Sequence, residues 1–264
     1  MLQKINSKKR TLIVDGSILV YRIASALEEV VQWEDDMWTL HSDLKLGKRV
    51  LDTSLRNYQD KLNCNKIIIA EDHKDNFRVS LYPQYKAHRK KIRKPIIVKP
   101  LKEYMYKNYE SISFPSCEGD DACGIFATQS LNKDSVVILS GDKDLRTIPG
   151  IHHFIHDEST EIVDETSANY NFMYQTLTGD MTDGFGGCPG VGGVKASRVL
   201  ANKKDLPEMW EAVVAEYKRA NLDEDYALTQ ARLARILRAS DWDSKKKEPI
   251  LWRPNDQQRH IWKS

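Results

Sequence analysis

The sequence has little of what marks secreted or membrane-embedded proteins. Its 264 residues include four cysteines, at positions 64, 117, 123 and 188, and no two of them form a CxxC pair. We interpret them as reduced thiols rather than as zinc ligands or disulfides. No apolar run reaches about 18 residues, which excludes a transmembrane helix. The apolar stretch Thr11–Val14 is too short for the hydrophobic region of a signal peptide, so we expect a cytoplasmic protein without membrane contact.

Acidic residues are missing from one segment, although the whole chain is nearly neutral. The composition has 40 Lys and Arg against 38 Asp and Glu, and its 41% of apolar residues suffices for a packed core, which excludes a disordered chain. Residues 86–94 read KAHRKKIRK and contain no acid. Elsewhere the acids come in pairs and triplets. This segregation indicates a site for cations and a separate site for a polyanion.

Three short apolar runs predict buried strands. They are Thr11–Val14, Lys66–Ala70 and Ser135–Leu139, and each is continuous and rich in Ile and Val. Continuous apolar runs are typical of a parallel sheet that is covered on both faces. Helical patterns lie between the strands, which predicts a doubly wound α/β core with a central, mainly parallel sheet flanked by helices. The predicted helices of this part span residues 17–31, 44–62 and 120–131.

Beyond residue 165 the pattern changes to helical stretches around a glycine-rich turn. We therefore predict an α/β core at residues 1–165 and a helical region at 166–264 that packs on it, because no linker separates the two. The core includes the basic segment 77–107, and the helical region includes a glycine-rich turn at 179–197. Its predicted helices span 169–178, 194–200, 206–220 and 225–239, and residues 241–264 give no assignment.

Acidic side chains follow each predicted strand. Asp15 ends the first strand, Asp72 follows the second, and Asp142 and Asp144 follow the third. The carboxyl ends of parallel strands meet at one edge of a sheet, so these side chains should converge there. Any one of them could instead be a turn former or a helix cap. The full set of candidate metal ligands is Asp15, Asp72, Glu118, Asp120, Asp121, Asp142, Asp144, Asp180 and Asp183.

Crowded carboxylates repel one another unless cations neutralise them. Hard divalent ions such as Mg²⁺ or Mn²⁺ prefer oxygen ligands. Two such ions about 3.5–4 Å apart can bind the attacking and leaving oxygens of a phosphodiester. A structural calcium site is the alternative, but the pattern of an EF-hand loop is absent. We therefore predict a catalytic site with two Mg²⁺ ions, for which Mn²⁺ can substitute.

The basic segment 77–107 interleaves cations with tyrosines, including Tyr82, Tyr85, Tyr104 and Tyr106. This combination suits phosphate contacts and base stacking. A solvated helix face is the alternative, but the position directly after Asp72 favours nucleic-acid binding.

The turn Gly190–Ser197 reads GVGGVKAS and precedes a predicted helix. Glycines let backbone amides approach phosphates at a helix N-terminus, as in a helix–hairpin–helix clamp. A purely structural turn is the alternative. The Walker A pattern GxxxxGK[ST] is not matched.

Five motifs together resemble one family. They are LIVDGS at 12–17, FR and YPQYKAHR after Asp72, CEGDDA at 117–122, SGDKDL at 140–145 and TGDMTDGFGGCPGVGGVKAS at 178–197. This combination is similar to the 5′ nucleases of the flap-endonuclease and 5′–3′ exonuclease type, especially the stand-alone phage enzymes, over residues 12–240. Glu71 and the stretch 184–187 depart from the family pattern. The resemblance implies a PIN-like core, a helical arch and a C-terminal helix–hairpin–helix-type (H3TH) region.

The resemblance also implies individual roles. Asp15, Asp72, Glu118 and Asp120 would hold the first metal, and Asp142, Asp144 and Asp183 the second, with Asp180 nearby and Asp121 as an outer acid. Lys86 and Arg89 would contact the scissile phosphate as catalytic residues, and Tyr85 would stack on a base. A K⁺ ion would sit at the glycine-rich turn. The further candidates for nucleic-acid binding are Lys90, Lys91, Arg93, Lys94, Gly190, Gly192, Gly193, Lys195 and Ser197.

The implied activity is a metal-dependent, structure-selective 5′ nuclease that leaves 5′-phosphate products. Its substrates would be DNA with a duplex and a 5′ single-stranded end or flap, and RNA primers in RNA–DNA hybrids. It would act during replication, in the host cytoplasm if phage-encoded, beside proteins such as a single-strand-binding protein. Two alternatives stay open: a PIN-like single-strand ribonuclease, which would not need the glycine clamp, and a catalytically inactive DNA-binding relative, which would gain nothing from the acids.

Overall fold

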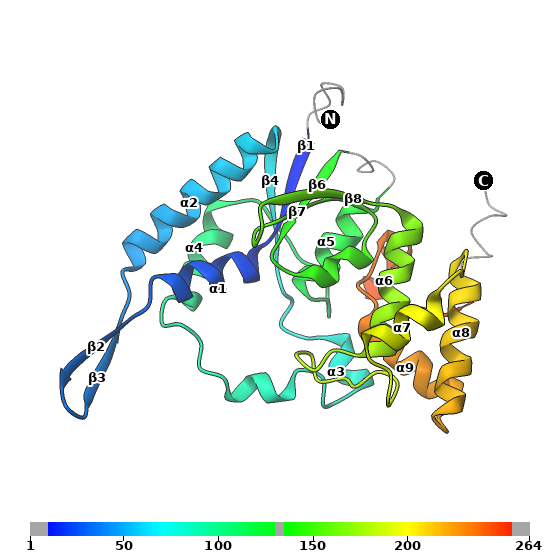
Figure 1. Cartoon of the computed structure of the whole chain (residues 1–264). Helices are drawn as coiled ribbons and strands as arrows, with labels where there is room; N and C mark the ends of the chain where they lie inside the picture. Colours follow the sequence, from blue (N-terminus) through cyan, green and yellow to red (C-terminus); the bar gives the residue numbers. More distant parts are fainter. Residues whose placement is uncertain (1–9, 130–134, 255–264) are drawn as a thin grey trace.

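A six-stranded sheet forms the centre of the molecule (Figure 1). The computed structural model describes residues 10–129 and 135–254, apart from the side chain of Lys90. The strand order is β5-β4-β1-β6-β7-β8, and all pairs are parallel except β7 with β8. The predicted mainly parallel sheet is therefore confirmed. The strands are β1 (Arg10–Asp15), β4 (Cys64–Ala70), β5 (Ser111–Ile112), β6 (Val136–Ser140), β7 (Gly150–Phe154) and β8 (Ser159–Val163).

Helices cover both faces of the sheet because the central strand alternates its side chains between them. Leu12 and Val14 of β1 pack on one face, in a cluster that also holds residues of the helices α1, α2 and α4. Ile13 belongs to a different cluster, in which it packs with residues of α5. These helices are α1 (Gly16–Ala26), α2 (Leu44–Lys61), α4 (Val98–Asn108) and α5 (Gly119–Ala127).

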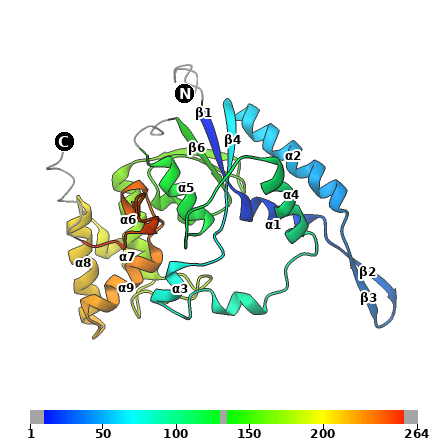
Figure 2. The same cartoon turned by 180° about the vertical axis from the view of Figure 1, so that it is seen from behind.

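The basic segment forms no continuous helix. It contains α3 (Phe77–Leu81), the 3-10 helix η2 (Ala87–Lys91) and most of α4. Figures 1 and 2 show the connection between α3 and α4 running below α1 as a long loop that carries η2. The arch implied by the sequence is thus a loop with short helices. The carboxylate of Glu28 fastens its far end, accepting hydrogen bonds from Arg93 and from the amide of Ile96.

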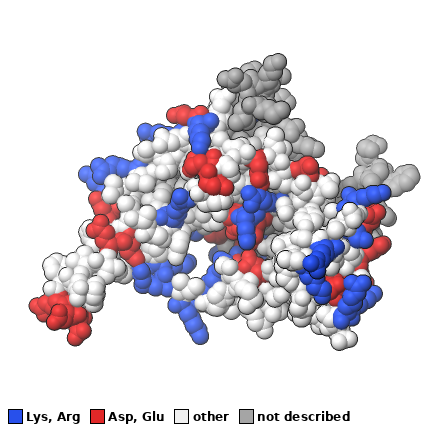
Figure 3. All heavy atoms as spheres, in the orientation of Figure 1, with Lys and Arg blue, Asp and Glu red and all other residues white. Residues whose placement is uncertain are grey.

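The predicted helix 17–31 is wrong over its last five residues. Helix α1 ends at Ala26, and the chain continues as the hairpin β2 (Glu29–Glu34) and β3 (Met37–His41). Its Val and Trp residues favour strands over helices. The hairpin projects from the body of the molecule (Figure 1), and the side chains of Trp33 and Trp38 are 65% and 57% exposed. Acidic residues gather at its tip (Figure 3).

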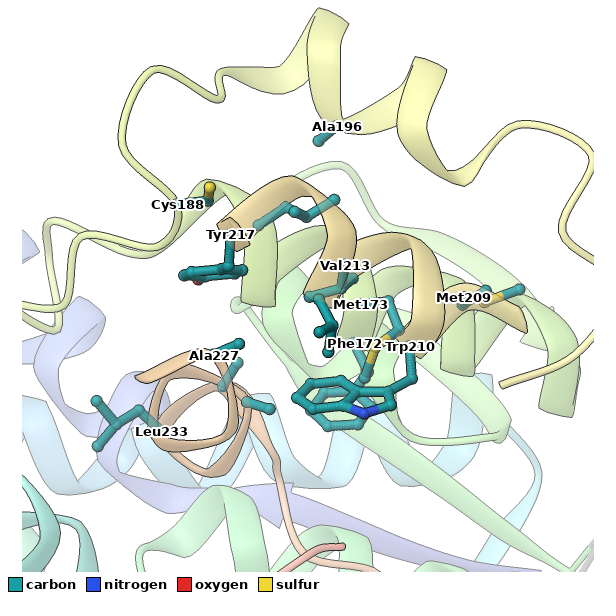
Figure 4. Close-up of a cluster of buried hydrophobic side chains, with 14 of the residues drawn as sticks. Phe172, Met173, Cys188, Ala196, Met209, Trp210, Val213, Tyr217, Ala227 and Leu233 are labelled. Atoms are coloured by element: carbon teal, nitrogen blue, oxygen red, sulfur yellow. The ribbon is translucent and has the colours of Figure 1, made fainter. Parts of the chain in front are cut away.

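Four helices with a common apolar core follow the sheet. They are α6 (Glu165–Thr178), α7 (Gly193–Leu200), α8 (Leu206–Arg219) and α9 (Glu224–Ala234). Phe172 and Met173 of α6 meet Trp210 and Val213 of α8 (Figure 4), and the Trp210 ring contacts that of Trp252 edge-on at 5.0 Å. The proposed boundary at residue 165 stays a prediction.

Two predicted helices end early. Helix α5 ends at Ala127, and the last positions predicted for it, 130 and 131, lie outside the described residues. Helix α9 ends at Ala234, because the next residues run extended into the core, where the carbonyl of Arg235 accepts a hydrogen bond from buried Arg78. The unassigned tail forms β9 (Trp242–Asp243) and β10 (Glu248–Pro249). No helix in the described part of the chain is long and apolar enough to cross a membrane.

Candidate functional site

The predicted acids meet at the carboxyl edge of the sheet. Asp15 closes β1, Asp72 lies two residues beyond β4, and Asp142 and Asp144 follow β6. Because β4 and β6 pair with opposite sides of β1, this edge is the topological switch point where open α/β sheets bind ligands. A cleft of about 250 Å³ opens there. Its acidic lining residues are Asp15, Asp72, Glu118, Asp120, Asp142, Asp144 and Asp183.

A second cleft of about 410 Å³ adjoins the first and shares Asp142, Asp144 and Asp183 with it. Asp180 lines this second cleft, where its carboxylate lies within hydrogen-bond reach of Asp144. A tight loop presents Asp180 and Asp183. In that loop the backbone amides and carbonyls of Asp180 and Phe185 pair in both directions, at 2.8 and 3.0 Å.

The acids at the sheet edge fall into two groups. The first, the central acids, comprises Asp15, Asp120, Asp142 and Asp144, and no Lys or Arg of the described residues forms an ion pair with any of them. Burial raises the pKa of Asp15 to about 6, and the nearby charge of Asp72 adds to the effect. Burial and the charges of Asp15 and Asp142 raise the pKa of Asp120 well above its usual value. The charge of Lys86 partly offsets the rise at Asp120, but no Lys or Arg of the described residues pairs directly with any of the four carboxylates.

Neutral partners hold three of the central acids in place. The hydroxyl of Ser140 donates to Asp15 Oδ2 at 3.1 Å, and the Gln175 side-chain amide donates to Asp144 Oδ2 at 2.8 Å. Asp142 caps the 3-10 helix η3 (Lys143–Thr147) by accepting from the Asp144 amide at 2.8 Å. Burial and the charge of Asp142 raise the pKa of Asp144 to about 7.

The second group, the paired acids, comprises Glu118, Asp183 and Asp72, and each contacts a cation of the chain. The Lys86 ammonium lies 2.5 Å from Glu118 Oε1 and 3.4 Å from Asp183 Oδ2. Arg89 Nη2 lies 2.5 Å from Asp183 Oδ1, and Arg89 Nε donates to the carbonyl of Thr182 at 3.0 Å. Lys86 and Arg89, the two cations predicted to be catalytic, therefore contact the acids directly.

Lys102 of α4 is the cation that pairs with Asp72, the third acid of this group. Its ammonium donates to the Ser17 hydroxyl at 2.6 Å and lies 3.2 Å from Asp72 Oδ2. Ser17 in turn donates to the same carboxylate at 2.5 Å, and the Gly119 amide donates to Asp72 Oδ1 at 2.9 Å. Burial alone would raise the pKa of Asp72, but the charge of Lys102 and these hydrogen bonds lower it.

Asp121, predicted as a metal ligand, is instead a structural residue. It is fully buried, and both of its oxygens bind Arg78, at 2.7 and 2.8 Å. They also accept from the amides of Glu118 and Leu237, at 3.0 Å each. With these contacts on both oxygens, Asp121 has no position left for a metal ion.

Tyr85 is also placed differently from its predicted role in base stacking. Its side chain is 4% exposed, and its ring lies against Phe185 with centroids 6.5 Å apart. The hydroxyl donates toward Glu118 Oε2 at 2.8 Å and Asp183 Oδ2 at 2.9 Å. A buried ring cannot stack on a base. Tyr85 instead connects the basic segment to the acids through its hydrogen bonds to Glu118 and Asp183.

The other cations of the basic segment differ in their surroundings. Arg93 forms a bidentate pair with Glu28, at 2.5 and 3.1 Å, which fastens the loop rather than leaving the charge free. Lys91 and Lys94 are exposed, and no ion pair of either occurs among the described residues. The side chain of Lys90 lies outside the described part of the structure.

The glycine-rich turn ends at the N-terminus of α7. Gly192 precedes the helix and no side chain caps it, and a Cβ added at Gly190 or Gly192 would meet no heavy atom within 4 Å. A Cβ on Gly193 would lie 2.4 Å from the hydroxyl of Tyr174. The backbone at 190 and 192 is therefore open to the outside. Of the other predicted residues, Ser197 is exposed and Lys195 forms an ion pair with buried Glu216.

The donor set fits hard divalent cations. Every acid of the cleft offers carboxylate oxygens, which are the ligands that Mg²⁺ and Mn²⁺ prefer. The central acids form no ion pair within the described part of the chain, so their oxygens are available to such an ion. No three His, Cys, Asp or Glu side chains of residues 10–129 and 135–254 stand in an arrangement that could already hold one ion. The paired acids are held by Lys86, Arg89 and Lys102.

Sequence reasoning missed Arg78, Lys102, Ser17 and Gln175. Arg78 lies in the FR pair that carried the family resemblance, and Lys102 lies within the basic segment. Neither has a local pattern that marks it as a partner of an acid. Gln175 projects from α6 toward Asp144 across a separation of 31 residues, which periodicity alone does not reveal.

Comparison with known proteins gives a family match. Residues 10–173 match the model of the 5′–3′ exonuclease family, N-terminal resolvase-like domain. The chain is 29% identical to the exonuclease of Escherichia phage T7, over 93% of this chain and 94% of that one. It is 25% identical to DNA polymerase I of Bacillus subtilis, over 87% of this chain but 28% of the polymerase.

Among solved structures, the fold is similar to that of a bacteriophage T5 flap endonuclease in a pseudo-enzyme-product complex with DNA and metal ions. The TM-score is 0.66 at 14% identity, over 86% of this chain and 89% of that one. A T5 5′-exonuclease with bound zinc gives a TM-score of 0.63 at 15% identity, with coverage of 86% and 89%.

Proposed function

Because this chain belongs to the 5′–3′ exonuclease family, we propose that it is a metal-dependent 5′ nuclease selective for the structure of its substrate. It hydrolyses phosphodiester bonds as a 5′–3′ exonuclease and flap endonuclease and leaves 5′-phosphate products. One observation carries this proposal. The central acids form no ion pair with a Lys or Arg of the described residues. They lie in the same cleft as Lys86 and Arg89 of the basic segment.

Two Mg²⁺ ions fit the acids, with Mn²⁺ as a substitute. Asp15, Asp120, Asp142 and Asp144 would hold them first, and Glu118, Asp183 and Asp72 would join once their present partners move. When bound, such ions supply Lewis-acid stabilisation of phosphate charge and lower the pKa of water.

The cations of the chain bind and orient the substrate. Lys86 and Arg89 reach the cleft from η2 and its N-terminus, so both can contact the non-bridging oxygens of the scissile phosphate. Positive groups aimed at those oxygens stabilise the charge that develops in the transition state. Tyr85 fixes their position because its hydroxyl binds the same two acids, Glu118 and Asp183.

A duplex arm of the substrate would bind the glycine-rich turn. The first amides of α7 have no capping side chain, and the positive end of a helix dipole favours phosphate. The open face at Gly190 and Gly192 lets a phosphate backbone come close. The turn Gly190–Ser197 would hold a K⁺ ion, which would supply positive charge for binding phosphate.

The substrates are DNA with a duplex and a 5′ single-stranded end or flap, and RNA primers paired with DNA. The DNA in the T5 complex and the relatives among phage exonucleases and bacterial DNA polymerases support a role in replication. A single-strand-binding protein would then be a working partner, in the cytoplasm of the host.

Three substrates test the activity: a 5′-labelled flap, a blunt duplex and a single-stranded RNA, each with Mg²⁺ or with a chelator. We expect Mg²⁺-dependent cleavage of the flap and the duplex end, with 5′-phosphate products. If the single-stranded RNA is the only one of the three substrates that is cleaved, the result would instead support a PIN-like ribonuclease. Flap binding without cleavage in Mg²⁺ and in Mn²⁺ would indicate an inactive relative.

A further inference from the structure

Lys86 contacts acids that belong to different parts of the chain. Its ammonium touches Glu118, which precedes α5, and Asp183, which lies in the loop after α6. The family resemblance assigns these two carboxylates to different metal ions. The ammonium therefore contacts one candidate ligand from each of the two expected metal sites.

The backbone of Lys86 is fixed, while its side chain can leave. The Lys86 amide donates to the carbonyl of Asp183 at 2.8 Å, and the residue has a left-handed conformation with φ of 53°. The neighbouring Tyr85 is buried and bound to the same acids. The lysine side chain itself is 20% exposed and lines the open cleft. Rotation about its side-chain bonds can move the charge without moving the chain.

Glu118 and Asp183 have few oxygens left for a metal ion. Glu118 Oε1 binds Lys86, while its Oε2 accepts from Arg78 at 3.2 Å and from Tyr85. Asp183 Oδ1 binds Arg89, and its Oδ2 faces Tyr85 and Lys86. A divalent ion at either carboxylate would meet the ammonium at close range, and like charges repel strongly in a partly buried site.

We propose that Lys86 is a resident cation of the metal site, which occupies Glu118 and Asp183 in the free protein and moves to the phosphate when substrate arrives. This inference rests on the proposed function. The same charge then serves two ligands in turn. Phosphate binding removes the ammonium from the acids and frees them for the metal. By thermodynamic reciprocity, metal binding releases Lys86 toward the phosphate and strengthens phosphate binding.

Lys86 differs in this respect from the other two cations. Arg89 also donates to the Thr182 carbonyl, and its pairing involves a single carboxylate. Lys102 is hydrogen bonded to Ser17 and likewise contacts a single acid, Asp72. Lys86 alone of the three bridges two carboxylates.

The first experiment measures Mn²⁺ binding by calorimetry on the full chain without nucleic acid. The variants are Lys86→Met and Lys86→Gln, and Lys91→Met is the control because Lys91 is an exposed cation of the same short helix. We expect both Lys86 variants to bind Mn²⁺ about tenfold more tightly than the wild type, within the usual range of coupling between two binding events. The control should match the wild type.

Equal or weaker Mn²⁺ affinity in both Lys86 variants, with thermal unfolding that shows them folded, would overturn the inference. If neither the wild type nor any variant binds Mn²⁺, the proposed metal site and the proposed function are wrong. This outcome is distinguishable from equal, measurable affinities, which would contradict only the inference about Lys86.

The second experiment adds deoxythymidine 5′-monophosphate, which carries a phosphate but no bond to cleave. It should tighten Mn²⁺ binding in the wild type, and much less in Lys86→Met, because the variant has no ammonium to transfer. An equal effect of the nucleotide in both proteins, or none in the wild type, would show that Lys86 does not couple the two ligands.

Discussion

A substitution at Gly192 can test substrate binding without disturbing the fold. Its backbone is extended, with φ of −91°, and an added Cβ would meet no heavy atom within 4 Å. Gly187 has φ of 65°, and a Cβ there would lie 2.3 Å from the Gly179 amide nitrogen. The fold therefore requires glycine at 187 but accepts a side chain at 192.

We expect Gly192→Ser to leave the free energy of unfolding within about 0.5 kcal/mol of wild type, because serine is a good N-cap and the site is open. Duplex binding should weaken, since the side chain would stand between the first amides of α7 and a phosphate. A hydrogen bond to a charged group contributes about 1.5–3 kcal/mol, so losing one corresponds to roughly ten- to hundredfold in affinity.

Fluorescence anisotropy with a labelled duplex at constant ionic strength measures this effect, because phosphate binding responds to any salt. Urea unfolding of the same variant gives its stability, and cleavage of a purely single-stranded oligonucleotide should be almost unchanged. Gly187→Ser is the matched contrast and should lose stability instead. Wild-type duplex affinity in a folded Gly192→Ser protein would reduce the motif to a structural turn.

Three further predictions concern the acids and their partners. Asp144→Asn should lower cleavage by orders of magnitude. Because burial raises the pKa of Asp144 to about 7, against about 3.9 in an unfolded chain, its charge destabilises the metal-free fold increasingly from pH ~4 to ~7. The variant should thus melt at a higher temperature than wild type at pH 8 and at the same temperature at pH 4; equal midpoints at pH 8 would contradict this. Arg89→Ala should slow cleavage about 10²–10³-fold, whereas Lys91→Ala should keep the rate and reduce the salt slope of binding by about one; equal effects would indicate a diffuse basic surface. Arg78→Met should cost about 3–5 kcal/mol in urea unfolding because it leaves Asp121 buried and unpaired, and adding Asp121→Leu should restore most of the loss; a cost below about 1 kcal/mol would refute this.

The sheet and its acidic edge could be predicted because their signals are local. Runs such as Lys66–Ala70 identify parallel strands by composition alone, and a carboxylate directly after a strand must lie at the edge. The convergence of Asp15, Asp72 and Asp142 follows from topology without any side-chain contact. The hairpin after α1 was missed because Ile23 and Leu27 continue a helical spacing up to the point where strand-forming residues begin.

The division of the acids into two groups could not be predicted, because it depends on contacts between distant residues. Arg78 meets Asp121 across 43 positions and Lys102 meets Asp72 across 30, and neither pair leaves a periodic trace in the sequence. For the same reason the sequence placed Asp121 beside Asp120 among the candidate ligands and did not reveal its pairing with Arg78. Their side chains differ in surroundings because one faces a buried guanidinium and the other faces the cleft.

A site that gathers carboxylates repels the phosphate it has to bind, and the arrangement of cations addresses this conflict. Lys86 and Arg89 stand among the acids, so the cleft presents positive charge beside negative charge. The exposed Lys91 and Lys94 lie further along the same loop, where they would attract the strand without competing for metal. The proposed function thus gives one stretch of chain two kinds of cation: Lys86 and Arg89 pair with acids of the cleft, and the exposed Lys91 and Lys94 would attract nucleic acid.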